Sequence, residues 1–167
     1  MPAFVLRPLT DVDHDWLCGV VAEYCGGDPV ITPDGVYGVR DLPGYVAEED
    51  GTRVGLAQYR IAAADCEIIT LASLSSGRGI GSELVTAVRA VAERAGCRRL
   101  RVCTTNDNLN ALGFYQKRGF ALARVHRGAM ERVRQVKPGV PLVGAGRIPL
   151  RDIIELELTL NDPGASE

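Results

Sequence analysis

The chain has 167 residues, a length that one domain can fold around a single core. Hydrophobic residues make up 46% of it and charged residues 24%, as in ordinary globular proteins. A net charge of −2 argues against nucleic-acid binding through bulk positive charge, and no apolar stretch reaches the roughly 18 residues that cross a bilayer. The first residues lack a signal-peptide pattern. We therefore expect one domain over residues 1–167, located in the cytoplasm, without nucleic-acid or membrane partners.

The cysteines and the distribution of charge along the chain narrow the class of protein further. Five cysteines, an odd number without a C-x-x-C spacing, predict reduced thiols and neither a disulfide frame nor a metal site. Residues 1–67 contain twelve acidic and four basic residues, whereas residues 124–151 contain seven basic residues and only Glu131 as an acid. Two interpretations stay open: two solvated faces of opposite sign, or an acidic side that attracts an amine and a basic side that meets an anion.

The first half of the chain predicts antiparallel strands and one helix. Alternating apolar residues predict strands over residues 3–7, 45–49, 54–61 and 66–72. Asp11 or Asp13 can cap a helix that stops at Gly26-Gly27. Residues 28–44 hold three prolines and three glycines, which predicts an irregular loop facing the substrate.

The second half of the chain alternates helices with strands. The predicted elements are a helix from Ile80 that stops at Gly96, a strand over 100–104, a helix capped by Asn106 or Asp107 that ends at Gly119, a strand over 120–126, a helix over 127–136, a loop over 137–150 and a strand over 152–160. A meander followed by strands alternating with helices indicates a mixed α/β sheet.

A glycine-rich segment, Ser75-Ser76-Gly77-Arg78-Gly79-Ile80-Gly81-Ser82, lies between a predicted strand and a predicted helix. Its glycines leave backbone N–H groups unobstructed, and the helix start adds the positive end of a dipole, so the segment predicts a phosphate cradle. The G-x-G-x-x-G and G-K-[ST] patterns of nucleotide-binding folds are absent. By itself the glycine run also fits a tight turn that only leads into a helix.

A second segment, Asn108-x-x-Ala111-x-x-x-Tyr115-x-x-x-Gly119-Phe120, follows the glycine-rich segment, and the two together are more specific than either alone. Residues 78–84 resemble motif A of the GNAT superfamily of N-acetyltransferases, and the second segment resembles its motif B. The close resemblance covers about residues 67–126. It implies an α/β (α+β) fold in which helices flank a mixed, mostly antiparallel sheet, splayed by a cofactor cleft between the strands at 67–73 and 99–104. It also implies acetyl-CoA as co-substrate.

The resemblance assigns residues to the acetyl-CoA site. The pantetheine arm would pair with backbone near Leu71, Ala72 and Ser73, and Asn108 would bond its amide beside Ala111 and Phe114. The pyrophosphate would lie on the glycine-rich segment, with the assigned residues being Ser76, Gly77, Arg78, Gly79, Ile80, Gly81 and Ser82. Ser76 departs from the family, which usually has Gln or Arg there, so Arg78 is expected to supply a nearby charge.

Two residues are candidates for the chemistry. Tyr115 would protonate or hydrogen-bond the leaving thiolate, since a phenol has a pKa of about 10; the alternative is an aromatic residue of the core. Glu67 would take the proton of the amine, directly or through water; the alternative is a solvated glutamate at a strand edge. Asp65 or Glu23 could serve instead.

The predicted function is N-acetyltransfer from acetyl-CoA to an amine of a small molecule or peptide, by direct transfer. Two other classes stay open, namely a non-catalytic acyl-CoA-binding regulator on the same fold and an unrelated α/β nucleotide-binding module. The sequence does not identify the acceptor, which residues 28–44 and 127–150 are expected to select. It also leaves open whether the protein is a monomer or a homodimer.

Overall fold

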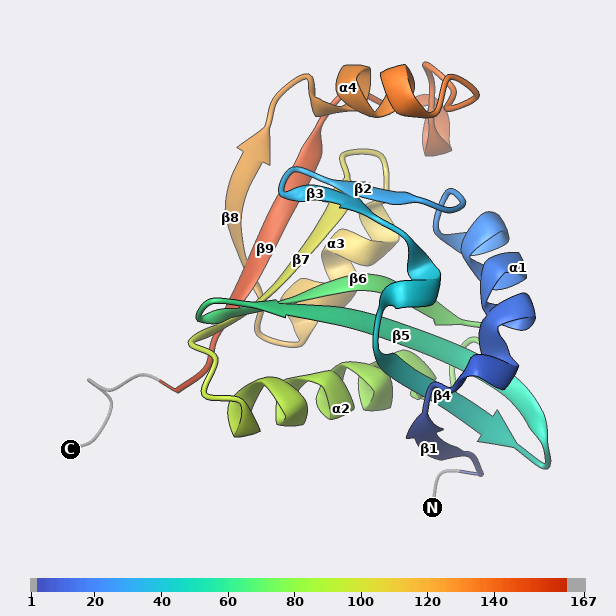
Figure 1. The fold of residues 1–167 in the computed structure, drawn as a ribbon. Helices are drawn as coiled ribbons and strands as arrows, with labels where there is room; N and C mark the ends of the chain where they lie inside the picture. The colour runs from blue at the N-terminus through green and yellow to red at the C-terminus, as the bar shows by residue number, and fades with distance from the viewer. Residues whose placement is uncertain (1–2, 162–167) are drawn as a thin grey trace.

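Seven strands form one twisted sheet in the computed structural model, which describes residues 3–161. The sheet order is β1-β4-β5-β6-β7-β9-β8 (Figure 1). All neighbouring strands are antiparallel except β6 and β7, so the expectation of a mixed, mostly antiparallel sheet is confirmed. The strands are Val5–Pro8 (β1), Gly44–Glu49 (β4), Thr52–Ala62 (β5), Asp65–Ser73 (β6), Arg99–Thr105 (β7), Ala121–His126 (β8) and Ile153–Thr159 (β9).

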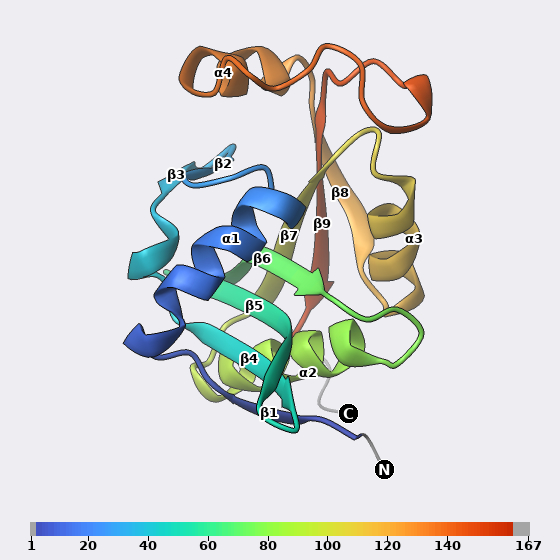
Figure 2. The same ribbon diagram turned by 90° about the vertical axis from the view of Figure 1, so that its right-hand side faces the viewer.

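Helices cover both faces of this sheet (Figures 1 and 2). On one face α2 (Ile80–Arg94) and α3 (Leu109–Lys117) bury a core that includes Leu84 and Leu100. On the other face α1 (His14–Tyr24) packs Leu17 and Val21 against Leu56. Successive strand residues point to opposite faces, which is why neighbouring positions of β5 enter different cores.

A small hairpin corrects the expectation that residues 28–44 are irregular. Strands β2 (Val30–Thr32) and β3 (Gly35–Tyr37) pair across a two-residue turn and are followed by the 3₁₀ helix Val39–Asp41. Strands of three residues are too short to show an alternating pattern. The segment is instead held by distant groups, because the buried Gln58 amide donates a 2.7 Å hydrogen bond to the carbonyl oxygen of Val39.

The segment after β8 lies across the ends of β7 and β9 (Figure 2). It contains α4 (Ala129–Val136) and the 3₁₀ helix Ala145–Arg147. The Arg134 guanidinium donates to the carbonyl oxygens of Val140, Pro141 and Leu150, which closes the segment on itself. Between residues 3 and 161 there is no helix with the length and apolar character required to span a membrane.

Candidate functional site

A cleft opens in the middle of the sheet, between β6 and β7. The two strands pair only from Asp65–Arg99 to Ile68–Val102, and beyond this point they diverge. Tyr59 of β5 pairs with Ile68, and Gln58 pairs with Thr70, so Ile69 is an extra residue in β6. Such a bulge bends its strand, and here it directs the end of β6 away from β7. The predicted splay is confirmed.

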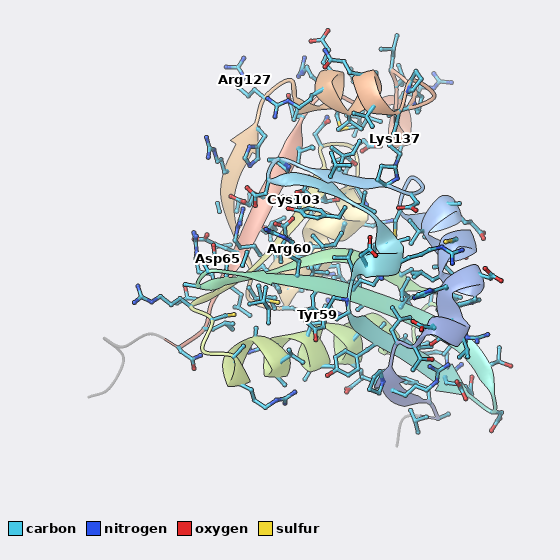
Figure 3. The ribbon with its side chains drawn as sticks, in the orientation of Figure 1. Tyr59, Arg60, Asp65, Cys103, Arg127 and Lys137 are labelled. Carbon is cyan, nitrogen blue, oxygen red and sulfur yellow. The ribbon has the colours of Figure 1, made fainter. Side chains whose placement is uncertain are left out.

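A cavity of about 730 Å³ occupies this cleft, a volume typical of small-molecule sites. Its walls come from β6, β7 and α3, and it is covered by the end of α1, by β2 and by α4 with the residues that follow. Cys103 of β7 and Lys137 after α4 both line it (Figure 3). The Lys137 ammonium donates to the carbonyl oxygens of Gly27 and Pro29 at 2.6 and 2.8 Å, which joins the two covering segments.

Four of the residues assigned to acetyl-CoA line this cavity: Leu71, Asn108, Ala111 and Tyr115. Asn108 also caps α3, since its Oδ1 accepts the Ala111 N–H at 3.1 Å. The expected caps, Asn106 and Asp107, instead hold the segment before β9 through hydrogen bonds to its backbone. One side chain of the second motif thus caps a helix and faces the cleft.

Tyr115 is buried, with 5% of its surface exposed, and packs edge-on against Phe114 and Phe120. Burial raises the pKa of its phenol above the ordinary value, so the hydroxyl keeps its proton at neutral pH. Tyr115 therefore belongs to the core and to the cavity wall at once. Phe114 does not line the cavity and instead stacks beneath the Arg118 guanidinium, 3.5 Å away.

The glycine-rich segment forms a turn that exposes backbone amides. Gly77 and Gly79 have φ values of +75° and +77°, a conformation that glycine adopts without strain, and open space surrounds both. Gly79 is the N-cap of α2, and no side chain caps this helix. The first N–H groups of α2, from Ile80 to Ser82, are thus available to an anion.

Side chains of this segment, and of the end of β6 that precedes it, contact other parts of the protein. Ile80 is buried in the core, and Ser73 donates to the carbonyl oxygen of Ser75. Arg78 forms a two-pronged ion pair with Glu49, so its charge is directed to the β4–β5 turn and away from the expected role in the cradle. Ala72 is buried against the α1 core.

Arg118 is a residue that the sequence reasoning missed. Its guanidinium donates to Ser82 Oγ, with Nε 2.9 Å away, and to the carbonyl oxygen of Phe114. It therefore brings a positive charge to the first turn of α2, where Arg78 was expected to act. The available signal was its place directly before Gly119 in the second motif.

Glu67 lies on β6, 2% exposed, and neither of its carboxylate oxygens has a hydrogen-bond partner among the residues that the structure describes. Burial, and then the nearby Asp34 carboxylate, raise the pKa of Glu67 to about 7. Arg101 bonds Asp34 with Nη1 at 2.9 Å, pairs with Glu155, and lies 3.9 Å from Glu67. Glu67 is thus a buried carboxyl and not a solvated strand-edge residue.

Glu67 stands behind the cavity wall, because the lining includes its neighbours Ile68 and Cys103 but not Glu67 itself. The other candidate bases fit less well. Asp65 is engaged by the Arg99 guanidinium at 2.7 and 2.9 Å, and Glu23 is exposed on α1; neither lines the cavity.

Cys25 was not singled out from the sequence, yet it lines the cavity at the end of α1. Burial raises the pKa of its thiol, while the backbone N–H of Leu71 and the charge of Lys137 oppose the rise. Leu71 and Cys25 thus lie next to one another in the cavity wall. Cys103, the other cysteine of the wall, is a neutral thiol because burial raises its pKa to about 12.

The profile of the acetyltransferase (GNAT) family matches residues 19–120. YdhI of Bacillus subtilis (strain 168), described as uncharacterized, is 36% identical over 151 residues that cover 90% of this chain and 94% of YdhI. An IAA acetyltransferase from Bacillus cereus ATCC 14579 has a TM-score of 0.71 at 21% identity, covering 94% of this chain and 99% of its own. A GNAT family acetyltransferase from Elizabethkingia anophelis, solved with acetyl-CoA bound, has a TM-score of 0.71 at 19% identity, covering 96% and 100%.

Proposed function

Because the chain belongs to the GNAT family of acetyltransferases, we propose that it transfers the acetyl group of acetyl-CoA directly to the nitrogen of an amine. The observation that carries this proposal is the cleft itself. It opens where β6 leaves β7, and it is lined by Tyr115 and by the Leu71 backbone. The family assignment also removes the unrelated nucleotide-binding module as an alternative.

The residues present fit acetyl-CoA. The uncapped amino end of α2, with Arg118 beside it, suits the pyrophosphate, and the diverging strands offer unpaired backbone to the pantetheine arm. When bound, acetyl-CoA supplies an activated thioester. The backbone N–H of Leu71, a residue of the cavity wall, would polarise the thioester carbonyl.

The proton transfers fall to Tyr115 and Glu67. The amine nitrogen forms a bond to the carbonyl carbon while the carbon–sulfur bond breaks, and the Tyr115 hydroxyl gives its proton to the departing thiolate. Glu67 takes a proton from the amine through water, since it stands behind the wall. A pKa of about 7 suits this task, because about half of the carboxyl groups are ionised at neutral pH and the group still holds a proton well enough to accept one.

Two measurements on the wild-type protein test the proposal. Acetyl-CoA at micromolar concentration should raise the melting temperature, because a ligand that binds only the folded state stabilises it, whereas ATP and NAD should not. Free thiol should then be released when members of an amine panel are added. Tight acetyl-CoA binding without thiol release for any amine would favour the non-catalytic regulator, and no stabilisation by any CoA ester would refute the donor site.

A further inference from the structure

A second cavity, of about 480 Å³, lies next to the cleft. It is bounded by the β2–β3 turn, the end of β8 and the start of α4. Ile31, Thr32, Val133 and Ile153 line both cavities, so a single layer of residues separates them. A molecule held in the second cavity would therefore lie beside the part of the cleft that β2 and α4 cover.

Three arginines line this second cavity: Arg124, Arg127 and Arg132. All three are exposed, and among residues 3–161 none of their guanidinium groups forms an ion pair or a side-chain hydrogen bond. Figure 3 shows Arg127 between β8 and the start of α4. Three guanidinium groups around one hollow favour an anionic ligand, because each presents several N–H donors to a carboxylate or a phosphate.

Three of the other four cations of the same basic segment are used differently, and the fourth, Arg147, is exposed and lines neither cavity. Arg134 and Lys137 donate to backbone carbonyls and so hold the fold, and Arg151 contacts Asp152. The three arginines of the cavity have no such structural task. This contrast favours the second interpretation of the uneven charge, in which the basic side meets an anion.

A fourth polar group has no partner here. His126 lines the same cavity, and its Nε2 is buried without a hydrogen-bond partner among the described residues. A buried polar atom without a partner costs free energy, so a ligand in this cavity would recover that cost once the imidazole turns its Nε2 toward it.

The opposite wall carries negative charge. Asp34, at the β2–β3 turn, lines the cavity and is the carboxylate that raises the pKa of Glu67. The cavity thus presents cations on one side and, on the other, a carboxylate next to the candidate base. An amine that also bears an anionic group would find a partner for each charge.

We propose that this cavity is the anion subsite of the acceptor, and that the enzyme acetylates amines carrying a carboxylate or a phosphate group. This inference rests on the proposed function. The phosphates of CoA are a poor alternative occupant, since no residue of the glycine-rich segment 75–82 lines the cavity. The shared chemistry is an oxyanion bound by guanidinium groups, and the test separates its two sources.

The experiment compares pairs of amine acceptors in which one member carries the anionic group and the other does not. Thiol release is measured with β-alanine against β-alaninamide for a carboxylate, and with phosphoethanolamine against ethanolamine for a phosphate. One anionic member should have a kcat/KM at least about tenfold above its neutral partner, because a charge-assisted hydrogen bond is worth about tenfold to a hundredfold. The pair that shows the preference identifies the anion.

The variants locate the effect. The double variant Arg127→Gln, Arg132→Gln should abolish the preference and leave acetyl-CoA affinity unchanged. Arg147→Gln is the matched control, because Arg147 is an exposed cation of the same segment that lines neither cavity. Both anionic amines are also titrated into the CoA-saturated proteins, and the double variant should bind them more weakly than the wild type. This second measurement does not depend on turnover.

The outcomes separate the two proposals. Loss of the preference in the double variant alone supports the subsite. Equal use of neutral and anionic amines, a preference that survives the double variant, or no binding of either anionic amine to CoA-saturated protein overturns the subsite while the proposed function stands on its own tests. Failure of acetyl-CoA to bind the wild type would instead overturn the proposed function.

Discussion

The proposed donor end of the site, for acetyl-CoA, and the proposed acceptor end, for the amine, are built by different means. The donor end consists of one continuous segment, residues 75–82, whose backbone amides open the uncapped helix α2. The acceptor end consists of side chains on β2, β8 and α4, which are up to about a hundred residues apart and meet only in the folded protein. A site made of backbone leaves a local sequence pattern, whereas a site made of distant side chains leaves none.

The largest effect is expected at Tyr115, which belongs to neither end alone. Tyr115→Phe keeps the ring and its edge-on packing against Phe114 and Phe120 but removes the proton donor. We expect kcat to fall by roughly a hundredfold, within the range of general acids, while acetyl-CoA affinity hardly changes. Steady-state kinetics together with calorimetric titration of acetyl-CoA measure both. A loss confined to KM would mean that Tyr115 only positions ligand.

Glu67→Gln tests the proposed general base through the pH dependence of kcat/KM. Because the pKa of Glu67 is about 7, kcat/KM of the wild type should fall as the pH decreases through 7, when the carboxyl becomes protonated. The variant should lack this acidic limb and be slower by roughly tenfold at pH 8, below the usual effect of a general base because the proton passes through water. An unchanged pH profile would assign the proton to another group.

The same substitution should change the pH dependence of stability. In the folded protein the pKa of Glu67 is raised from its ordinary value of 4.5 to about 7. The folded state therefore binds this proton more tightly than the unfolded chain does. Its contribution to the free energy of unfolding is fully present below about pH 4.5 and is lost as the pH rises through 7. Denaturation of Glu67→Gln between pH 5 and pH 8 should lack this decline, and an identical decline in both proteins would contradict the raised pKa.

Gly79→Ala tests the donor end, with Gly96→Ala as its matched control. Both glycines have a positive φ, +77° and +75°, and a Cβ would meet open space at each, so each substitution should destabilise the fold by about 1–2 kcal/mol. Only Gly79 is at the amino end of α2, so only Gly79→Ala should weaken acetyl-CoA binding, by several-fold. Equal acetyl-CoA affinities of the two variants would mean that the segment is merely a turn.

Gly81 is unsuitable for this comparison, although the sequence suggests it equally. A Cβ at Gly81 would lie 3.2 Å from the ring of Phe114, so a larger residue would disturb the packing of α2 on α3. A loss of binding in such a variant would not separate the phosphate cradle from this contact.

The smallest expected effect is a shift of the pH profile in Asp34→Asn. The Asp34 carboxylate helps to raise the pKa of Glu67, and it also engages Arg101 at 2.9 Å. Its removal takes away a negative charge and frees the guanidinium for Glu67, and both changes lower the pKa of Glu67. The acidic limb of kcat/KM should therefore move to lower pH; a limb that stays in place would show that the two carboxyls are independent.

The same contrast explains what could be predicted from the sequence. The strands and the turn at Gly77 and Gly79 follow from alternation, helical spacing and glycine chemistry, whereas the cleft was expected from the resemblance of two motifs to the GNAT family; the structure confirms all three. The β2–β3 hairpin could not be predicted, because its strands of three residues are too short to show a pattern, and the 3₁₀ turn that follows it is held by the distant Gln58. For the same reason the ion pair of Arg78 could not be predicted: its partner Glu49 is distant in the sequence.

The measurement that tests the central claim most directly follows the acetyl group itself. Cys25 lines the cavity beside the Leu71 amide, so an acetyl group held on this thiol is the concrete rival to direct transfer. The wild-type protein is mixed with acetyl-CoA and then with the preferred amine, and its intact mass is recorded during a single turnover. Direct transfer predicts an unmodified protein throughout, with thiol release and acetylated amine appearing at the same rate. A protein heavier by one acetyl group before the amine is added, whose acetyl then passes to the amine, would contradict it.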